Sequence, residues 1–312
     1  MKIFQNSSSN KKHIKKYGFY EFNFNFSEYI PQILKYLSTR KCLPSQTYMD
    51  ELKKNLKCSS RKLLKDEHFT AYPRHLEILK CPNLLNIIND KRIIQYIEKY
   101  LGGKCSISGF NIWWSNPKKE RSPHTQKFHR DPPSNNKKKL KVFIYLSDVK
   151  NINNGPHVYI SFSHDKYKFL YSLFCKNIKK IIFFKDNPFF IIRNMASFFR
   201  GTYHKDGNEY PIDKLSNIML DKNVIKTFYG NAGKAFITLP CGLHKAEVPK
   251  DKARLIIAIT YCSRNDIDLN DRYSVQIDKN DLKKIVKSDI DEEFILRNKS
   301  ILNTSLESEN YA

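Results

Sequence analysis

The chain has 312 residues, of which 40% are hydrophobic and 13% are aromatic, so it can form a packed core of one large domain or two ordinary ones. This composition argues against an intrinsically disordered chain. The sequence contains no run of 18 apolar residues, so we expect no membrane-spanning helix.

The 55 basic and 31 acidic residues give a formal net charge of +24. A basic surface can bind nucleic acid, anionic lipid or an anionic substrate. The lysines are spread along the whole chain instead of forming one arm, and Lys, Asn and Ile are abundant together. We therefore expect no dedicated nucleic-acid site, although the charge alone leaves nucleic-acid binding open.

The cysteine pattern and the N-terminal residues predict the cellular compartment of the protein. The cysteines are odd in number, widely spaced and free of any C-x-x-C pair, which argues against a disulfide framework or a zinc ribbon. The start, MKIFQNSSSNKKHIKK, has positive charge but no apolar region after it, so it does not resemble a secretory signal. We expect reduced thiols and a cytoplasmic protein.

The N-terminal third is predicted to form a helical layer over residues 17–104. Residues 1–16 are polar, and we expect a flexible start there. The sequence KKYGFYEFNF then alternates as a short strand does, and Ser27 is placed to cap a helix through about residue 40.

A second helix has clearer boundaries. Asp90 can cap its first turn, and the glycine pair after Leu101 can end it. Apolar residues recur at helical spacing between these points, which predicts one buried face: Ile93, Ile94, Ile97 and Leu101.

Short β-rich runs dominate from residue 105 to residue 262. Several short strands with long returns are typical of a jelly roll. We predict a single domain over residues 1–312 with a mainly β, cupin-like core over about 105–262. This core carries an insertion at 165–228, and a charged, partly helical extension follows at 263–312. The predicted strands lie in CSISGFNIWWS, LKVFIYLSDV, GPHVYISF, GKAFITLP and RLIIAITYC.

The stretch FHRD at 128–131 has two interpretations. With Asn136 it matches the H-R-D-x-x-x-x-N pattern of a protein-kinase catalytic loop. A kinase also needs a glycine-rich loop and a strand lysine upstream and D-F-G downstream, and the chain has no D-F-G. Without Arg130 the stretch is H-x-D, a spacing that puts an imidazole and a carboxylate on one face of a strand.

A metal site needs a third ligand from elsewhere in the chain. His244 follows a β-rich run and a small turn, so a late strand can bring it to His129 and Asp131. Two histidines and one carboxylate on one face of iron form the facial triad of non-haem Fe(II) oxygenases. The open positions can hold a chelating α-keto acid and dioxygen. Arg254 begins the next strand, where its guanidinium can bind the far carboxylate of that acid.

These blocks together resemble the phytanoyl-CoA dioxygenase family of Fe(II)/2-oxoglutarate-dependent oxygenases. The resemblance rests on FHRD, LKVFIYLSDV, NGPHVYISFSH, GNAGKAFITLPCGLHKA and RLIIAITY, and it covers residues 17 to 262 in scattered pieces. It implies a double-stranded β-helix in which His129, Asp131 and His244 hold iron. Arg254 would bind 2-oxoglutarate, and Tyr145 is a further candidate contact for this co-substrate.

The resemblance also implies an activity. It predicts a dioxygenase that hydroxylates a C–H bond of a small or carrier-linked substrate with O2 and releases succinate and CO2. Halogenating relatives carry a small residue in place of Asp131, so the aspartate favours hydroxylation. Two alternatives stay open: a non-catalytic jelly-roll module that binds sugar or nucleic acid, and a zinc hydrolase that uses the same three ligands.

Overall fold

The computed structural model describes most of the segments named above. The larger ranges outside the described part are residues 1–6, 45–69 and 166–223. None of the helices in the described part is long and apolar enough to cross a membrane. The described ranges are 7–40, 42–44, 70–73, 75–117, 126, 128–131, 138–165, 224–266, 275–276, 282–284, 286, 290–299 and 301–303.

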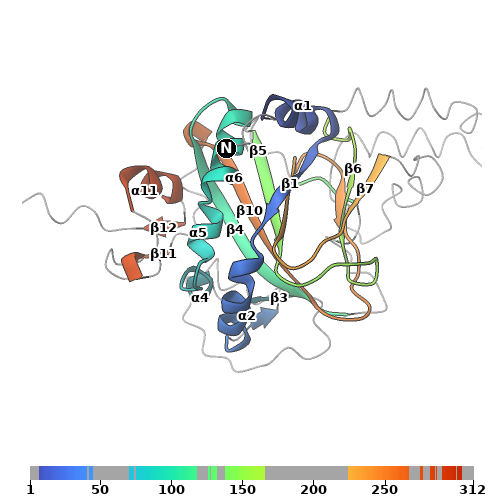
Figure 1. Ribbon diagram of the computed structural model, residues 1–312, viewed down its shortest axis with the longest axis horizontal. Coiled ribbons are helices and arrows are strands. Elements are labelled where there is room, and N and C mark those ends of the chain that lie inside the picture. The colour runs from blue at the N-terminus through green and yellow to red at the C-terminus, as the bar shows by residue number, and fades with distance from the viewer. Residues whose placement is uncertain are drawn as a thin grey trace, which may run out of the picture.

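Two antiparallel sheets form the centre of the molecule (Figure 1). The small sheet has the order β7 (Ile225–Phe228), β6 (His157–Ile160), β9 (His244–Ala246). The large sheet has the order β1 (Phe19–Asn25), β8 (Lys234–Thr238), β5 (Lys139–Tyr145), β10 (Arg254–Ser263), β4 (Cys105–Ser115), β3 (Thr70–Pro73), β2 (Cys42–Pro44).

The chain passes between the two sheets in the way that defines a double-stranded β-helix. From β4 in the large sheet it reaches His129, which pairs with His244 of the small sheet, and then returns to the large sheet as β5. β6 and β7 follow in the small sheet, and β8, β9 and β10 alternate between large, small and large. The predicted jelly-roll fold is therefore confirmed.

Alternation along β5 separates two regions of the core. Val142 and Ile144 pack toward the helices, whereas Phe143 and Tyr145 point into the space between the sheets. This inner space is lined largely by aromatic side chains, including Tyr159, Phe228 and Phe236. Because both faces of β5 are covered here, both sets of side chains are apolar, and the run Val142–Tyr145 is continuously buried.

Helices cover the outer face of the large sheet (Figure 1). The helix predicted after Asp90 is confirmed as α6 (Lys91–Leu101): the Asp90 carboxylate accepts from two backbone N–H groups, and Gly102 ends the helix in the left-handed conformation. The other α-helices of the described chain are α1 (Ser7–Tyr17), α2 (Ile30–Ser38), α4 (His75–Leu79), α5 (Leu84–Ile88) and α11 (Glu292–Asn298).

Three predictions for the N-terminal third need correction. Residues 7–16 belong to helix α1, which buries Ile14, instead of forming a flexible start. The range 17–104 also supplies β1, β2 and β3 to the large sheet, so it is not only a helical layer. Ser27 does not cap a helix; it begins the 3₁₀ turn Ser27–Tyr29, and its hydroxyl donates to the Asn25 side chain.

The predicted insertion at 165–228 includes one strand of the core. Residues 166–223 lie outside the described part of the chain, but Ile225–Phe228 form β7 and pair with β6. The end of the insertion was therefore predicted too late. The run IKTF is short and contains two polar residues, and its strand pairing becomes visible only in the sheet.

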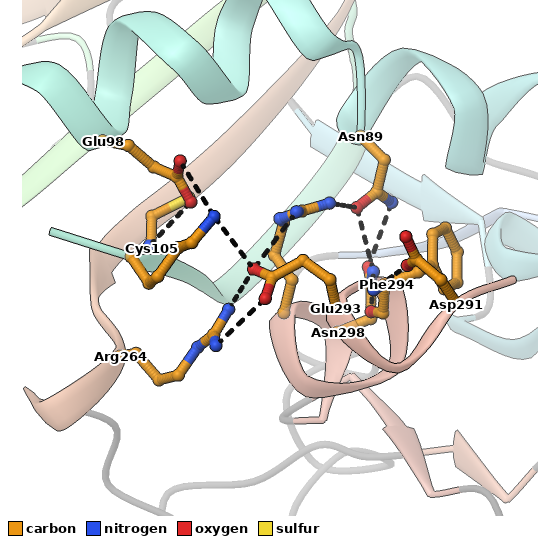
Figure 2. Close-up of polar contacts among 10 residues, drawn as sticks. Asn89, Glu98, Cys105, Arg264, Asp291, Glu293, Phe294 and Asn298 are labelled. Atoms are coloured by element: carbon orange, nitrogen blue, oxygen red, sulfur yellow. Dashed lines mark hydrogen bonds and ion pairs between the residues drawn. The ribbon is translucent and has the colours of Figure 1, made fainter.

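The C-terminal extension packs on the core through polar contacts (Figure 2). Glu293 of α11 accepts hydrogen bonds from Arg264 and lies 3.9 Å from the Lys104 ammonium. The Asn298 amide donates to the Asn89 side chain at 2.9 Å. Short elements flank this region: the 3₁₀ turn Arg264–Asp266 and the parallel pair β11 (Val275–Gln276) and β12 (Leu302–Asn303).

Replacing Gly233 with alanine is expected to destabilise the fold by about 1–3 kcal/mol. Gly233 has φ +96°, and a Cβ atom there would lie 2.4 Å from the backbone nitrogen of Ser27. Urea unfolding of the variant and the wild type measures the difference. Gly109→Ala is the matched control, since a Cβ at Gly109 in β4 meets nothing within 4 Å. Equal stability of both variants would contradict the prediction.

The Glu21 carboxylate connects β1 to two neighbouring strands and should make stability depend on pH. It pairs with Lys226 of β7 and lies 3.2 Å from Lys234 of β8. Burial alone would raise the pKa of Glu21, but the two lysines outweigh it and lower the pKa below its ordinary value of 4.5.

Because the folded pKa is lowered, this contribution is fully present above pH 4.5 and is lost as the pH falls below that value. Glu21→Gln should therefore reduce the free energy of unfolding at pH 7 and have less effect near pH 3. Urea unfolding at both pH values tests this, with the exposed Glu28→Gln as control. A Glu21→Gln effect that does not change with pH would exclude the assignment.

Candidate metal centre

The segment 128–131 is held against the small sheet by backbone hydrogen bonds. His129 and His244 exchange both of their N–H···O=C bonds at 3.0 Å, and the Asp131 N–H donates to the Pro240 carbonyl at 2.9 Å. The sequence could not specify this pairing, because the two histidines are far apart along the chain. It places both imidazoles on the inner side of the small sheet.

His129, Asp131 and His244 converge on one point. One possible ligand atom from each residue lies within 4.8 Å of the other two. The Asp131 Oδ1 atom is 3.6 Å from His244 Nε2 and 3.9 Å from His129 Nε2. His129 and His244 are only 8% and 4% exposed. Two imidazole nitrogens and one carboxylate oxygen are a suitable ligand set for a divalent transition metal.

Neighbouring groups orient two of these ligands. His244 Nδ1 lies 2.9 Å from the Gly242 carbonyl oxygen, so the proton is placed on Nδ1 and Nε2 is left to face the centre. The second carboxylate oxygen of Asp131, Oδ2, lies 2.5 Å from the Lys141 ammonium of β5. Burial alone would raise the pKa of Asp131, but Lys141 and His244 outweigh it and hold the pKa well below 3.8. Asp131 is therefore a carboxylate with one oxygen available at the centre.

Arg130 separates the two interpretations of the H-R-D sequence. Its side chain is buried on the opposite face, where it donates to the backbone carbonyls of Ser163 and Cys241. The arginine therefore has contacts within the fold, while His129 and Asp131 share the inner face as the H-x-D spacing predicts. The jelly-roll topology also differs from that of a kinase, so the kinase interpretation is excluded.

Arg254 begins β10 and is buried, with 2% of its surface exposed. One terminal nitrogen donates to the Gly155 carbonyl, and the other donates to Ser115 Oγ at 2.9 Å. Its Nε atom has no hydrogen-bond partner in the described part of the chain, and no described carboxylate forms an ion pair with it. Burial lowers the pKa of Arg254. A buried cation without a counter-charge is costly, so this position suits an anionic ligand.

The Tyr145 hydroxyl connects three strands of the interior. It donates to the Phe228 carbonyl at 2.9 Å and accepts from the His157 backbone N–H at 2.9 Å. Complete burial raises the pKa of Tyr145. Its one proton is used inside the protein, so the predicted contact between Tyr145 and a co-substrate stays a prediction.

Sequence reasoning missed two residues of this interior, Lys141 and His157. Both alternate with core residues of their strands, and that alternation was the available signal. The ring of His157 lies 5.5 Å from the ring of His244 and 4.4 Å from that of Phe143. Burial, followed by the nearby His244 and Arg254, lowers the pKa of His157 well below 6.5.

No protein-family model and no curated protein match the sequence. The resemblance to phytanoyl-CoA dioxygenases therefore stays a prediction.

The chain is similar to several solved structures at low identity. HygX from Streptomyces hygroscopicus, with nickel and 2-oxoglutarate bound, is 11% identical, with a TM-score of 0.46 over 82% of this chain and 86% of that one. EctD from S. alaskensis, with 2-oxoglutarate and 5-hydroxyectoine, is 13% identical, with a TM-score of 0.49 over 83% and 77%. The epimerase SnoN, with Fe3+, alpha ketoglutarate and nogalamycin RO, is 14% identical, with a TM-score of 0.47 over 83% and 84%. Identities and TM-scores this low do not assign a function to the chain, which has to follow from its own side chains.

Proposed function

We propose that the protein is an Fe(II)- and 2-oxoglutarate-dependent dioxygenase that hydroxylates a C–H bond of a small or carrier-linked organic substrate. The observation that carries the proposal is the combination of two features inside one jelly roll. A His-Asp-His cluster lies on the small sheet, and a buried arginine without an acidic partner begins a strand of the large sheet. A metal alone would explain the first feature but not the second.

The residues fit both groups. His129 Nε2, His244 Nε2 and Asp131 Oδ1 would hold the iron, since these atoms already face one another. Arg254 would bind the far carboxylate of 2-oxoglutarate through its free Nε–H and remaining N–H groups. When bound, iron and 2-oxoglutarate activate O2 and oxidise the substrate, with release of succinate and CO2.

The protein's own part is to position these groups and to exclude water. Lys141 holds Oδ2 of Asp131 and so leaves Oδ1 as the single oxygen directed at the metal. Gly242 fixes the tautomer of His244. Phe143, Phe228 and Phe236 line the interior and keep it apolar.

Hydroxylation is the reaction that we favour within this class. The Asp131 carboxylate occupies the position that halogenating relatives leave open, so no room for chloride is expected beside the metal. For the substrate we propose only a class, a small or carrier-linked organic molecule.

An anaerobic Fe(II) titration of the metal-free protein with 2-oxoglutarate tests the proposal. The expected result is a weak visible metal-to-ligand charge-transfer band that needs protein, iron and 2-oxoglutarate together. Without a band, retained zinc and oxygen-independent turnover would favour the hydrolase. Salt-sensitive nucleic-acid binding without iron affinity would favour the binding module, which the +24 net charge keeps as the second candidate.

A further inference from the structure

His157 packs against the metal centre and lies two residues from the backbone carbonyl that Arg254 contacts, and the proposed function assigns it no role. On one side, its ring packs against His244 with an interplanar angle of 29°. On the other side, Arg254 donates to the carbonyl of Gly155, two residues before His157 on the same segment. The segment 155–157 therefore connects the metal centre with Arg254.

The His157 side chain carries a buried polar atom without a partner. The residue is 4% exposed, and its Nε2 atom has no hydrogen-bond partner in the described part of the chain. Apolar rings surround it, with ring centroids 5.5 Å away at Phe236 and 5.8 Å away at Phe228. A polar nitrogen left unsatisfied in such a place is costly, and a leucine or phenylalanine would fill the space without that cost. A ligand that accepts or donates the missing hydrogen bond explains why a histidine occupies this position.

The two unpartnered nitrogens of this region have matching chemistry. Arg254 Nε and His157 Nε2 are both buried, they come from β10 and β6, and each can offer an N–H group. Arg254 donates to the Gly155 carbonyl, two residues before His157, so both groups belong to the same region of the interior. Since both lack an acceptor and one is a cation, an anion with two acceptor oxygens satisfies both. A carboxylate has this form.

We propose that His157 binds the co-substrate, donating from Nε2–H to one oxygen of the distal carboxylate of 2-oxoglutarate while Arg254 binds the other. This inference rests on the proposed function. It makes His157 a residue that selects dicarboxylic 2-oxo acids over monocarboxylic ones. A neutral imidazole adds a directional donor there without adding a second buried cation.

The test compares two ligands with and without the histidine. 2-Oxovalerate has the carbon chain of 2-oxoglutarate but no distal carboxylate. Dissociation constants for both ligands are measured anaerobically with the Fe(II) protein by the charge-transfer band. His157→Phe should weaken 2-oxoglutarate roughly tenfold to a hundredfold, as expected for a lost hydrogen bond to a charged group, and leave 2-oxovalerate within about twofold.

Further variants distinguish a lost hydrogen bond to the co-substrate from a change in the packing around His157. His157→Gln keeps a side-chain N–H donor and should recover part of the 2-oxoglutarate affinity. Phe228→Leu alters the same wall without removing a polar atom, and it should affect both ligands alike. His157→Leu replaces His157→Phe if the larger ring prevents folding, which circular dichroism reports.

Two outcomes would overturn the inference. Equal losses for both ligands would show that His157 acts through His244 or through packing. Unchanged affinity for 2-oxoglutarate would show that Arg254 alone binds the carboxylate. If the wild type gives no band with either ligand, the proposed function itself fails, and this result differs from both outcomes for the variant.

Discussion

Replacing Asp131 with alanine is expected to abolish the charge-transfer band and the slow formation of succinate from 2-oxoglutarate in the absence of substrate. Asp131 supplies the only anionic ligand of the cluster, and its Oδ1 atom lies within 4 Å of both imidazole nitrogens. Because changes beside a metal ligand already lower affinity about 10- to 100-fold, loss of the ligand itself should lower Fe(II) affinity by more than about a hundredfold.

His129→Ala and His244→Ala should give the same result, since two ligands do not hold the metal in an open three-ligand site. The control is His164→Ala, because the ring of His164 contacts the Lys15 carbonyl and is not part of the cluster. Anaerobic absorbance and mass-spectrometric succinate detection measure both effects. Wild-type succinate formation in any of the three variants would refute the metal assignment.

Replacing Arg254 with methionine is expected to raise the dissociation constant for 2-oxoglutarate by more than about a hundredfold, because a buried, charge-assisted bidentate contact is lost. Fe(II) affinity should stay within a few-fold, since Arg254 is not among the converging ligands. The expected change in stability without 2-oxoglutarate is small. Removing a buried cation that lacks a counter-charge offsets the loss of its contacts with Gly155 and Ser115.

Titration with 2-oxoglutarate and thermal unfolding of the metal-free variant test the two halves of this prediction. Arg254→Lys keeps the charge but loses the planar fork, so its affinity should lie between those of the methionine variant and the wild type. A large drop in melting temperature together with unchanged 2-oxoglutarate affinity would mean that Arg254 serves only the fold.

The single variants His157→Phe and Arg254→Met should also differ from each other in how strongly they weaken 2-oxoglutarate binding. Removing the guanidinium removes the charge that draws a dicarboxylate into the interior, whereas removing the imidazole removes one directional donor. The double variant should therefore lose less than the sum of the two single effects, because both groups are proposed to contact the same carboxylate. The same set of titrations supplies this comparison.

The sequence by itself determined the local elements. Short β-rich runs bounded by turn or polar residues marked β4, β5, β6, β8 and β10, because buried strands need apolar residues on both faces. The Asp90 cap and the glycines after Leu101 bounded α6, because helix ends need these residue types. The H-x-D spacing put His129 and Asp131 on one face, a property of any strand.

Only the tertiary structure decided which distant groups meet. The pairing of His129 with His244, the burial of Arg254 without an acidic partner and the Lys141 contact with Asp131 all depend on sheet register. Helix α1 escaped prediction because its polar sequence is helical only when Ile14 packs into the core. Alternation along β6 could place His157 on the face of Tyr159, but its position beside His244 follows from long-range strand pairing that no local pattern encodes.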